Sequence, residues 1–146
     1  MTLVDSPTEA DGQLIATLRG SVLRLGRRLR LEHDGDLTVS QLSVLGTIVR
    51  EGPLTIGELA THERVKPPSA TRTVTSLEDL GLLSRSASDD DGRHVIVALT
   101  DAGAATVAET RRLRDAWLRE RLTELSAADR RLLEAAAPLL DRLAQS

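Results

Sequence analysis

Apolar residues recur every three or four positions in three long stretches of the chain, a spacing that places them on one face of an α-helix. Two of the helices that this spacing predicts lie near the C-terminus, one opening at Thr100 and one at Ser126. The other runs from about Gln13 to Leu31, with an apolar stripe of Leu14, Leu18, Val22, Leu25 and Leu29. Each helix therefore has an apolar face that must pack against another surface.

The middle of the chain carries explicit signals for shorter helices. Thr38 is followed three residues later by Gln41, which is the spacing of a capping box at a helix start. Thr55 and Glu58 repeat that spacing at the start of the next helix. Gly52-Pro53 separates the two, because neither residue continues a helix easily.

A third helix in this region is predicted from Pro67 to Leu80, since prolines suit a first turn, where a missing N–H costs little. Gly81 should end it in a left-handed conformation. Next come an apolar pair, a polar stretch over residues 88–92, and a period-two alternation over residues 94–99. That pattern predicts a β-hairpin with a polar tip.

This order of elements is typical of a winged helix-turn-helix. We expect a mainly α fold with a small β-hairpin wing, in which residues 38–100 form a DNA-binding lobe and residues 13–32 and 101–145 form dimerisation helices. Residues 1–12 are expected to be a flexible tail that precedes a single domain over residues 13–146. The terminal helices offer more apolar surface than a winged-helix core can cover, which favours a two-fold dimer. An intramolecular three-helix bundle is the alternative.

Composition narrows the function. The 146 residues fit one domain, and the absence of cysteine excludes disulfides and thiolate chemistry. The histidines, His33, His62 and His94, lie on separate predicted elements, so we expect no metal site. No spacing of carboxylates, hydroxyls and histidines indicates catalysis or a cofactor. Because the chain has neither a long apolar run nor a secretion signal, we expect a cytoplasmic protein without a membrane partner.

The charge distribution matters more than the net charge of −3. Residues 19–30 carry arginines and no acid, and cations outnumber acids over residues 64–85. The cations over residues 64–85 suit the phosphates of nucleic acid. The arginines from Arg19 to Arg30 are instead expected to form a solvated face or the rim of a dimer interface. One feature argues against DNA binding, namely the acidic hairpin tip formed by Asp89, Asp90 and Asp91. Such a tip repels phosphate unless its carboxylates pair with cations.

The predicted helix from Pro67 has an inner and an outer face. A helical wheel directs Ala70, Thr73, Val74 and Leu77 inward. The candidate DNA-contacting residues on the outer face are Pro68, Ser69, Thr71, Arg72, Thr75 and Ser76. Arginine can bond guanine N7 and O6 in the major groove, while hydroxyls contact bases or phosphates. The alternative is a polar face that only meets water.

The hairpin supplies a second set of candidates. Arg93 is the best candidate for the minor groove, because a narrow groove concentrates negative potential and attracts a guanidinium. Asp89 or Asp91 could pair with Arg93, and such pairing could also orient it before DNA arrives. Lys66 and His94 are expected to reach phosphates.

Three segments carry a resemblance to a known family. They are residues 77–83 (Leu-Glu-Asp-Leu-Gly-Leu-Leu), 91–93 (Asp-Gly-Arg) and 99–103 (Leu-Thr-Asp-Ala-Gly). In this order and spacing the chain resembles the MarR family of bacterial transcription regulators over nearly its full length. It departs from the family at Gly92, where a basic residue is common, and in opening the recognition helix with Pro67-Pro68.

The resemblance implies a homodimer that places two recognition helices in successive major grooves and wing arginines in the flanking minor grooves. It also implies a repressor of transport or stress genes that a small molecule, bound between the two lobes, releases from DNA. The chain has no Phe or Tyr and one Trp, Trp117, so an effector pocket should be aliphatic with Arg or His as anion partners. A protein-interaction module and an effector-blind DNA-binding protein are the alternative functions.

Overall fold

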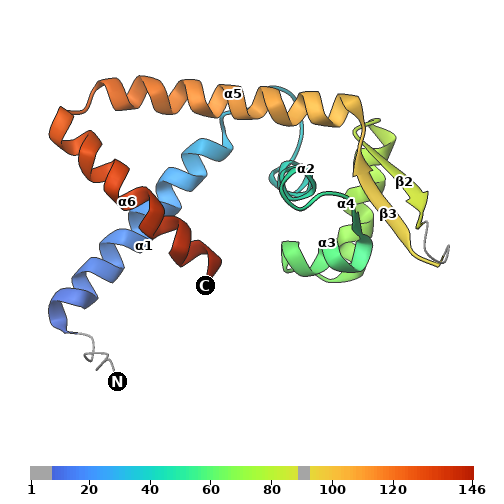
Figure 1. Ribbon diagram of the computed structural model, residues 1–146, viewed down its shortest axis with the longest axis horizontal. Coiled ribbons are helices and arrows are strands. Elements are labelled where there is room, and N and C mark those ends of the chain that lie inside the picture. Colours follow the sequence, from blue (N-terminus) through green and yellow to red (C-terminus); the bar gives the residue numbers. More distant parts are fainter. Residues whose placement is uncertain (1–7, 89–92) are drawn as a thin grey trace.

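The computed structural model describes residues 8–88 and 93–146, which form a mainly helical molecule with one small sheet (Figure 1). The elements follow in the order α1 (Glu9–Arg30), α2 (Val39–Glu51), β1 (Leu54–Thr55), α3 (Ile56–Glu63), α4 (Pro67–Asp79), β2 (Leu83–Ala87), β3 (Val95–Leu99), α5 (Asp101–Thr123) and α6 (Ala127–Gln145). This arrangement confirms the predicted winged helix-turn-helix flanked by terminal helices.

The molecule divides into two parts that α5 joins (Figure 1). At one end of α5, helices α2, α3 and α4 pack with the sheet, and at the other end α1 and α6 cross each other. The sheet is antiparallel with strand order β1-β3-β2, so β3 pairs with both neighbours. In the described part of the chain no helix is both long and apolar enough to span a membrane.

The hydrophobic core lies in the winged-helix part. It draws Leu45 from α2, Leu59 from α3, Leu77 from α4 and Val97 from β3, all without exposed surface. Because burial of one such side chain contributes roughly 1.5–3 kcal/mol, this cluster holds α4 and the sheet in a fixed relation.

Local capping accounts for where the helices begin. Thr38 and Thr55 each accept a hydrogen bond from the backbone N–H three residues later, and the side chains of Gln41 and Glu58 accept from the cap N–H groups. Both predicted capping boxes are therefore confirmed. Ser126 likewise caps α6 through the N–H of Asp129.

The first helix begins earlier than predicted. It starts at Glu9 rather than at about Gln13, because Thr8 and Asp11 form a further capping box. Hydrogen bonds from the Thr8 backbone N–H and hydroxyl lower the pKa of the Asp11 carboxyl. The expected tail over residues 1–12 is wrong for residues 9–12, and residues 1–7 of it lie outside the described residues.

The junction between α4 and α5 is tightly packed. Gly81 has a φ of 75° and closes α4 as predicted. The Thr100 hydroxyl caps α5 by accepting from the Gly103 N–H at 3.1 Å, and it donates to the Gly81 carbonyl at 2.6 Å. A Cβ on Gly103 would lie 2.1 Å from the Leu82 carbonyl oxygen, so only glycine allows this approach. The junction therefore ties the start of α5 to the end of α4.

Helices α1 and α6 leave their apolar faces uncovered in the single chain. Neither contains a buried residue, and Leu23, Leu132 and Leu143 are each more than half exposed. The alternative of an intramolecular three-helix bundle is therefore not supported. The guanidinium groups of Arg28 on α1 and Arg121 on α5 lie over the ring of Trp117 on α5, 5.1 Å and 5.7 Å from its centre. Trp117 therefore links α1 to α5.

Candidate nucleic-acid interface

Helix α4 has one face in the core and one toward solvent. Ala70, Val74 and Leu77 are buried, and Thr73 is half-buried, as the helical wheel predicted. The exposed side chains include five of the predicted DNA contacts, which are Pro68, Ser69, Thr71, Arg72 and Thr75. The outer face of α4 is thus accessible over most of its length.

The start of α4 is built without free backbone donors. Arg64 adopts a left-handed conformation (φ 55°, ψ 41°) that turns the chain from α3 into α4. Pro67 and Pro68 have no N–H, and the N–H groups of Ser69 and Ala70 both donate to the carbonyl of Lys66. A phosphate at this end would have to be bound by side chains, of which exposed Lys66 and Arg64 are the nearest in sequence.

The first two turns of α4 carry free hydrogen-bonding groups. Among the described residues, nothing forms a hydrogen bond or an ion pair with the side chains of Ser69, Thr71 or Arg72. A guanidinium beside two short hydroxyl side chains suits the floor of a major groove. These three side chains can therefore meet a ligand without first breaking a contact within the protein.

The last turns of α4 differ from the prediction. Ser76 is half-buried and accepts a hydrogen bond of 2.8 Å from Nε2 of Gln41 on α2. Its predicted outward orientation is wrong, because a helical wheel cannot show that α2 lies against this side of the helix. Thr75 is exposed, but its hydroxyl donates to the Thr71 carbonyl and accepts from Nη2 of Arg85.

Arg85 on β2 is a residue that the sequence reasoning did not assign to the site. Its Nε lies 2.6 Å from Oε2 of Glu78, and its Nη2 lies 2.6 Å from Oγ1 of Thr75. A signal was present in the sequence, since strand alternation puts Arg85 on the same face as Leu83, which is buried. That face turns toward the end of α4.

The hairpin brings two predicted residues to the wing. Arg93 and His94 are exposed just before β3, and the His94 carbonyl accepts a 2.8 Å hydrogen bond from the Ser88 N–H. Asp89 and Asp91, which were predicted to orient Arg93, lie outside the described residues. Their role stays a prediction.

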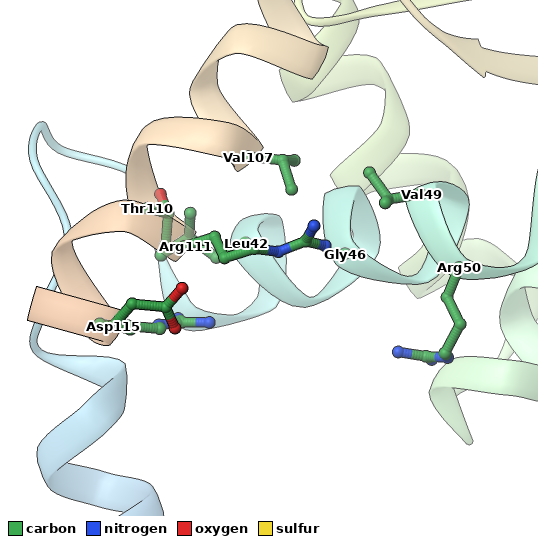
Figure 2. A pocket seen from close by; sticks show the side chains of 9 residues that line it. Leu42, Gly46, Val49, Arg50, Val107, Thr110, Arg111 and Asp115 are labelled. Atoms are coloured by element: carbon green, nitrogen blue, oxygen red, sulfur yellow. The ribbon is translucent and has the colours of Figure 1, made fainter. Parts of the chain in front are cut away.

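A pocket of about 380 Å³ lies between side chains of α2 and α5, which contact each other (Figure 2). Figure 2 shows the lining side chains on both helices, which include Arg50 on α2 and Val107, Arg111 and Asp115 on α5. A neighbouring hollow of about 320 Å³ shares Arg50 and adds Arg30. The lining combines aliphatic side chains with guanidinium groups.

This cavity is connected to the helix-turn-helix by hydrogen bonds. Nη2 of Arg50 donates to the hydroxyl of Thr47, which in turn donates to Oε1 of Glu63 at the end of α3. Ser43 donates to the other oxygen of Glu63 at 2.7 Å. Helix α2 therefore forms one wall of the cavity and also holds the turn that leads into α4.

Comparison with known proteins places the chain in a family. The family model described as MarR matches residues 37–95. An HTH-type transcriptional regulator of Mycobacterium tuberculosis (strain CDC 1551 / Oshkosh) is 42% identical over 133 residues, which cover 90% of this chain and 93% of the relative.

Two solved structures share the fold. A mutant of MarR from E. coli is similar with a TM-score of 0.72 and 29% identity, over 90% of this chain and 94% of that one. A mutant of S. aureus MepR bound to an oligodeoxyribonucleotide is similar with a TM-score of 0.67 and 19% identity, over 89% and 97% of the two chains. The chain belongs to the MarR family of transcriptional regulators and has the DNA-binding winged-helix fold of that family.

Proposed function

We propose that the protein binds operator DNA as a homodimer and represses transcription by occupying it. Helix α4 enters the major groove, and Arg93 of the wing enters the adjacent minor groove. The observation that carries this proposal is the exposed first half of α4, where Ser69, Thr71 and Arg72 have side-chain donors and acceptors unused by the described protein. The DNA-bound MepR structure has the same fold, which supports the choice of partner.

Exposed apolar surface supports the dimer. A cleft of about 530 Å³ lies between α1 and α6 and is lined largely by Ile15, Leu18, Val22, Leu140 and Leu143. Contiguous apolar surface of this kind is costly in water and is typically covered by a partner. We propose that residues 13–32 and 101–145 of a second copy cover it, which leaves residues 38–100 as the DNA-binding lobe.

Two-fold symmetry has a direct consequence for the DNA. Two copies of α4 related by a two-fold axis read the same half-site on opposite strands, so the operator should be a pseudo-palindrome. The two half-sites should be centred about one helical turn apart, roughly 34–36 Å, for both helices to enter the same side of the duplex.

The cavity between α2 and α5 supports control by a small molecule. It lies where the α5 arm meets the winged-helix part, and Arg50 links it through Thr47 to Glu63 (Figure 2). A ligand changes DNA affinity only if it binds one arrangement of the two parts better than the other. A ligand at their junction contacts both parts and so can favour one arrangement, and we propose that an effector bound there releases the operator.

The proposal is tested by selecting duplexes from a random-sequence pool and titrating the protein against the selected sequence and a scrambled one. A DNA-binding regulator should form a complex that favours the selected duplex and weakens steeply between about 50 and 200 mM salt. A module that binds only proteins would enrich no sequence and form no such complex.

A further inference from the structure

The side chain of Arg85 joins the wing to the recognition helix. Its guanidinium donates through Nε to Glu78 and through Nη2 to Thr75, both at 2.6 Å. The partners are three residues apart on α4, so they lie on adjoining turns of one helix face. A planar guanidinium held at two points fixes an orientation as well as a distance, which a lysine at the same place would not do.

The position of Arg85 in the sheet makes this contact important for the wing. Arg85 pairs with Val97 across the β2–β3 ladder, and Val97 is fully buried. Beyond this pair the hairpin runs on through residues whose side chains are largely exposed, toward Arg93 and His94. The hydrogen bonds of Arg85 therefore link the hairpin to α4 at the last level of the hairpin that packs against the core.

The same contact changes what Thr75 can do. A hydroxyl has one proton, and that of Thr75 is donated to the Thr71 carbonyl at 2.9 Å, while its oxygen accepts from Arg85. Thr75 is therefore no longer free to donate to a base edge or a phosphate. Its position on the outer face serves to hold Arg85.

We infer that Arg85 is a positioning residue for operator recognition: bound by Glu78 and Thr75, it sets the spacing between α4 and the wing. This inference rests on the proposed function. With the spacing fixed, Arg72 in the major groove and Arg93 in the minor groove engage the same duplex together. If the spacing is not fixed, Arg72 and Arg93 can still each contact DNA. Binding of one arginine then no longer places the other in position for its groove.

A direct contact between Arg85 and a DNA phosphate is the main competing role. The two roles predict opposite effects of the substitution Glu78→Gln, which removes a negative charge beside Arg85. If Arg85 held a phosphate, loss of the carboxylate would strengthen binding to any duplex. If Glu78 instead holds Arg85 so that the wing keeps its position relative to α4, loss of the carboxylate should weaken binding to the selected duplex.

Because A·T-rich DNA has a narrow minor groove, the wing arginine should favour A·T-rich flanks. The experiment therefore measures binding to the selected duplex with A·T-rich flanks, to the same duplex with G·C-rich flanks, and to a scrambled duplex. The variants are Arg85→Met, Glu78→Gln and the charge exchange Glu78→Arg with Arg85→Glu. Arg112→Met is the matched control, because Arg112 also pairs with a carboxylate, that of Glu109, but within α5 and away from the wing. Its loss changes the net charge by the same amount.

We expect Arg85→Met and Glu78→Gln each to weaken binding to the selected duplex about tenfold, which is typical of the loss of one coupled contact. Both variants should bind the scrambled duplex as wild type does. Both variants should also lose the preference for A·T flanks. The charge exchange should recover part of that preference. Arg112→Met, compared at an unchanged sedimentation coefficient because α5 belongs to the proposed dimerisation helices, should keep the wild-type flank preference. A merely structural role for Arg85 would lower thermal stability without changing the flank preference.

Four outcomes overturn the inference. Tighter binding by Glu78→Gln would assign Arg85 to a phosphate, as would an equal loss by Arg85→Met on all three duplexes. If both variants keep the flank preference and wild type remains selective, the spacing role of Arg85 is rejected while the proposed function stands. If wild type itself shows no selective complex, the proposed function and the inference fall together.

Discussion

Gly103→Ala should destabilise the protein, although alanine is a better helix former than glycine. The added Cβ would lie 2.1 Å from the Leu82 carbonyl oxygen and 3.1 Å from Cδ2 of Leu99. Non-bonded contacts are optimal near roughly 3.5–4.0 Å, so α5 and the end of α4 must separate by more than about 1 Å. Because the nearest atom belongs to the backbone, no change of rotamer relieves the clash.

The cost can be built up from the contacts at this junction. Overpacking of this kind costs about 1–3 kcal/mol. Separation also stretches the hydrogen bonds from Thr100 to the carbonyls of Leu82 (3.2 Å) and Gly81 (2.6 Å), each worth about 0.5–1.5 kcal/mol. The higher helix propensity of alanine compared with glycine offsets about 1 kcal/mol of this loss. The net loss in the free energy of unfolding is about 1–5 kcal/mol.

Thermal unfolding followed by circular dichroism checks this prediction. At about 3 °C per kcal/mol for a chain of this size, the Tm should fall by roughly 3–15 °C. Gly46→Ala is the control, because Gly46 is also inside a helix but has no heavy atom within 4 Å of the added Cβ. It should stabilise the protein by about 0.5–1 kcal/mol. A Gly103→Ala variant that unfolds at or above the wild-type Tm would refute the packing argument.

Three further substitutions test the proposed function. Arg72→Ala should weaken the selected duplex by roughly 1–3 kcal/mol and relax the base preference at one position per half-site, and an equal loss on scrambled DNA would make its contact a phosphate. Arg93→Ala should weaken binding most where the flanks are A·T-rich, and gel shifts on G·C-flanked duplexes provide the comparison. Leu140→Asp, in the α1–α6 cleft, should shift the protein from dimer to monomer in sedimentation, because a buried carboxylate opposes association; an unchanged sedimentation coefficient would place the interface elsewhere.

Sequence reasoning succeeded where structure is set by neighbouring residues. The helix starts at Thr38 and Thr55 and the stop at Gly81 depend on contacts within three or four positions, so their spacing was sufficient. The start at Thr8 was missed although it is also local. Its capping partner is Asp11, whereas the usual capping box has Glu or Gln at that position.

The site was predicted less completely because parts of it depend on contacts between distant segments. Ser76 is turned toward Gln41, thirty-five positions earlier in the chain, and this contact could not be read from the periodicity of α4. The tie between Arg85 and Glu78 joins a strand to a helix across the turn at Gly81. Periodicity identified the outer face of α4, but it could not distinguish side chains that are free from those that hold the fold.

Sedimentation velocity of the protein on its selected duplex measures how many chains bind one operator. Two 15.8-kDa chains should bind each duplex, with no such complex on a scrambled duplex at the same moderate salt concentration. A single chain on each duplex, or equal binding to both duplexes, would contradict a dimer that reads sequence through paired recognition helices.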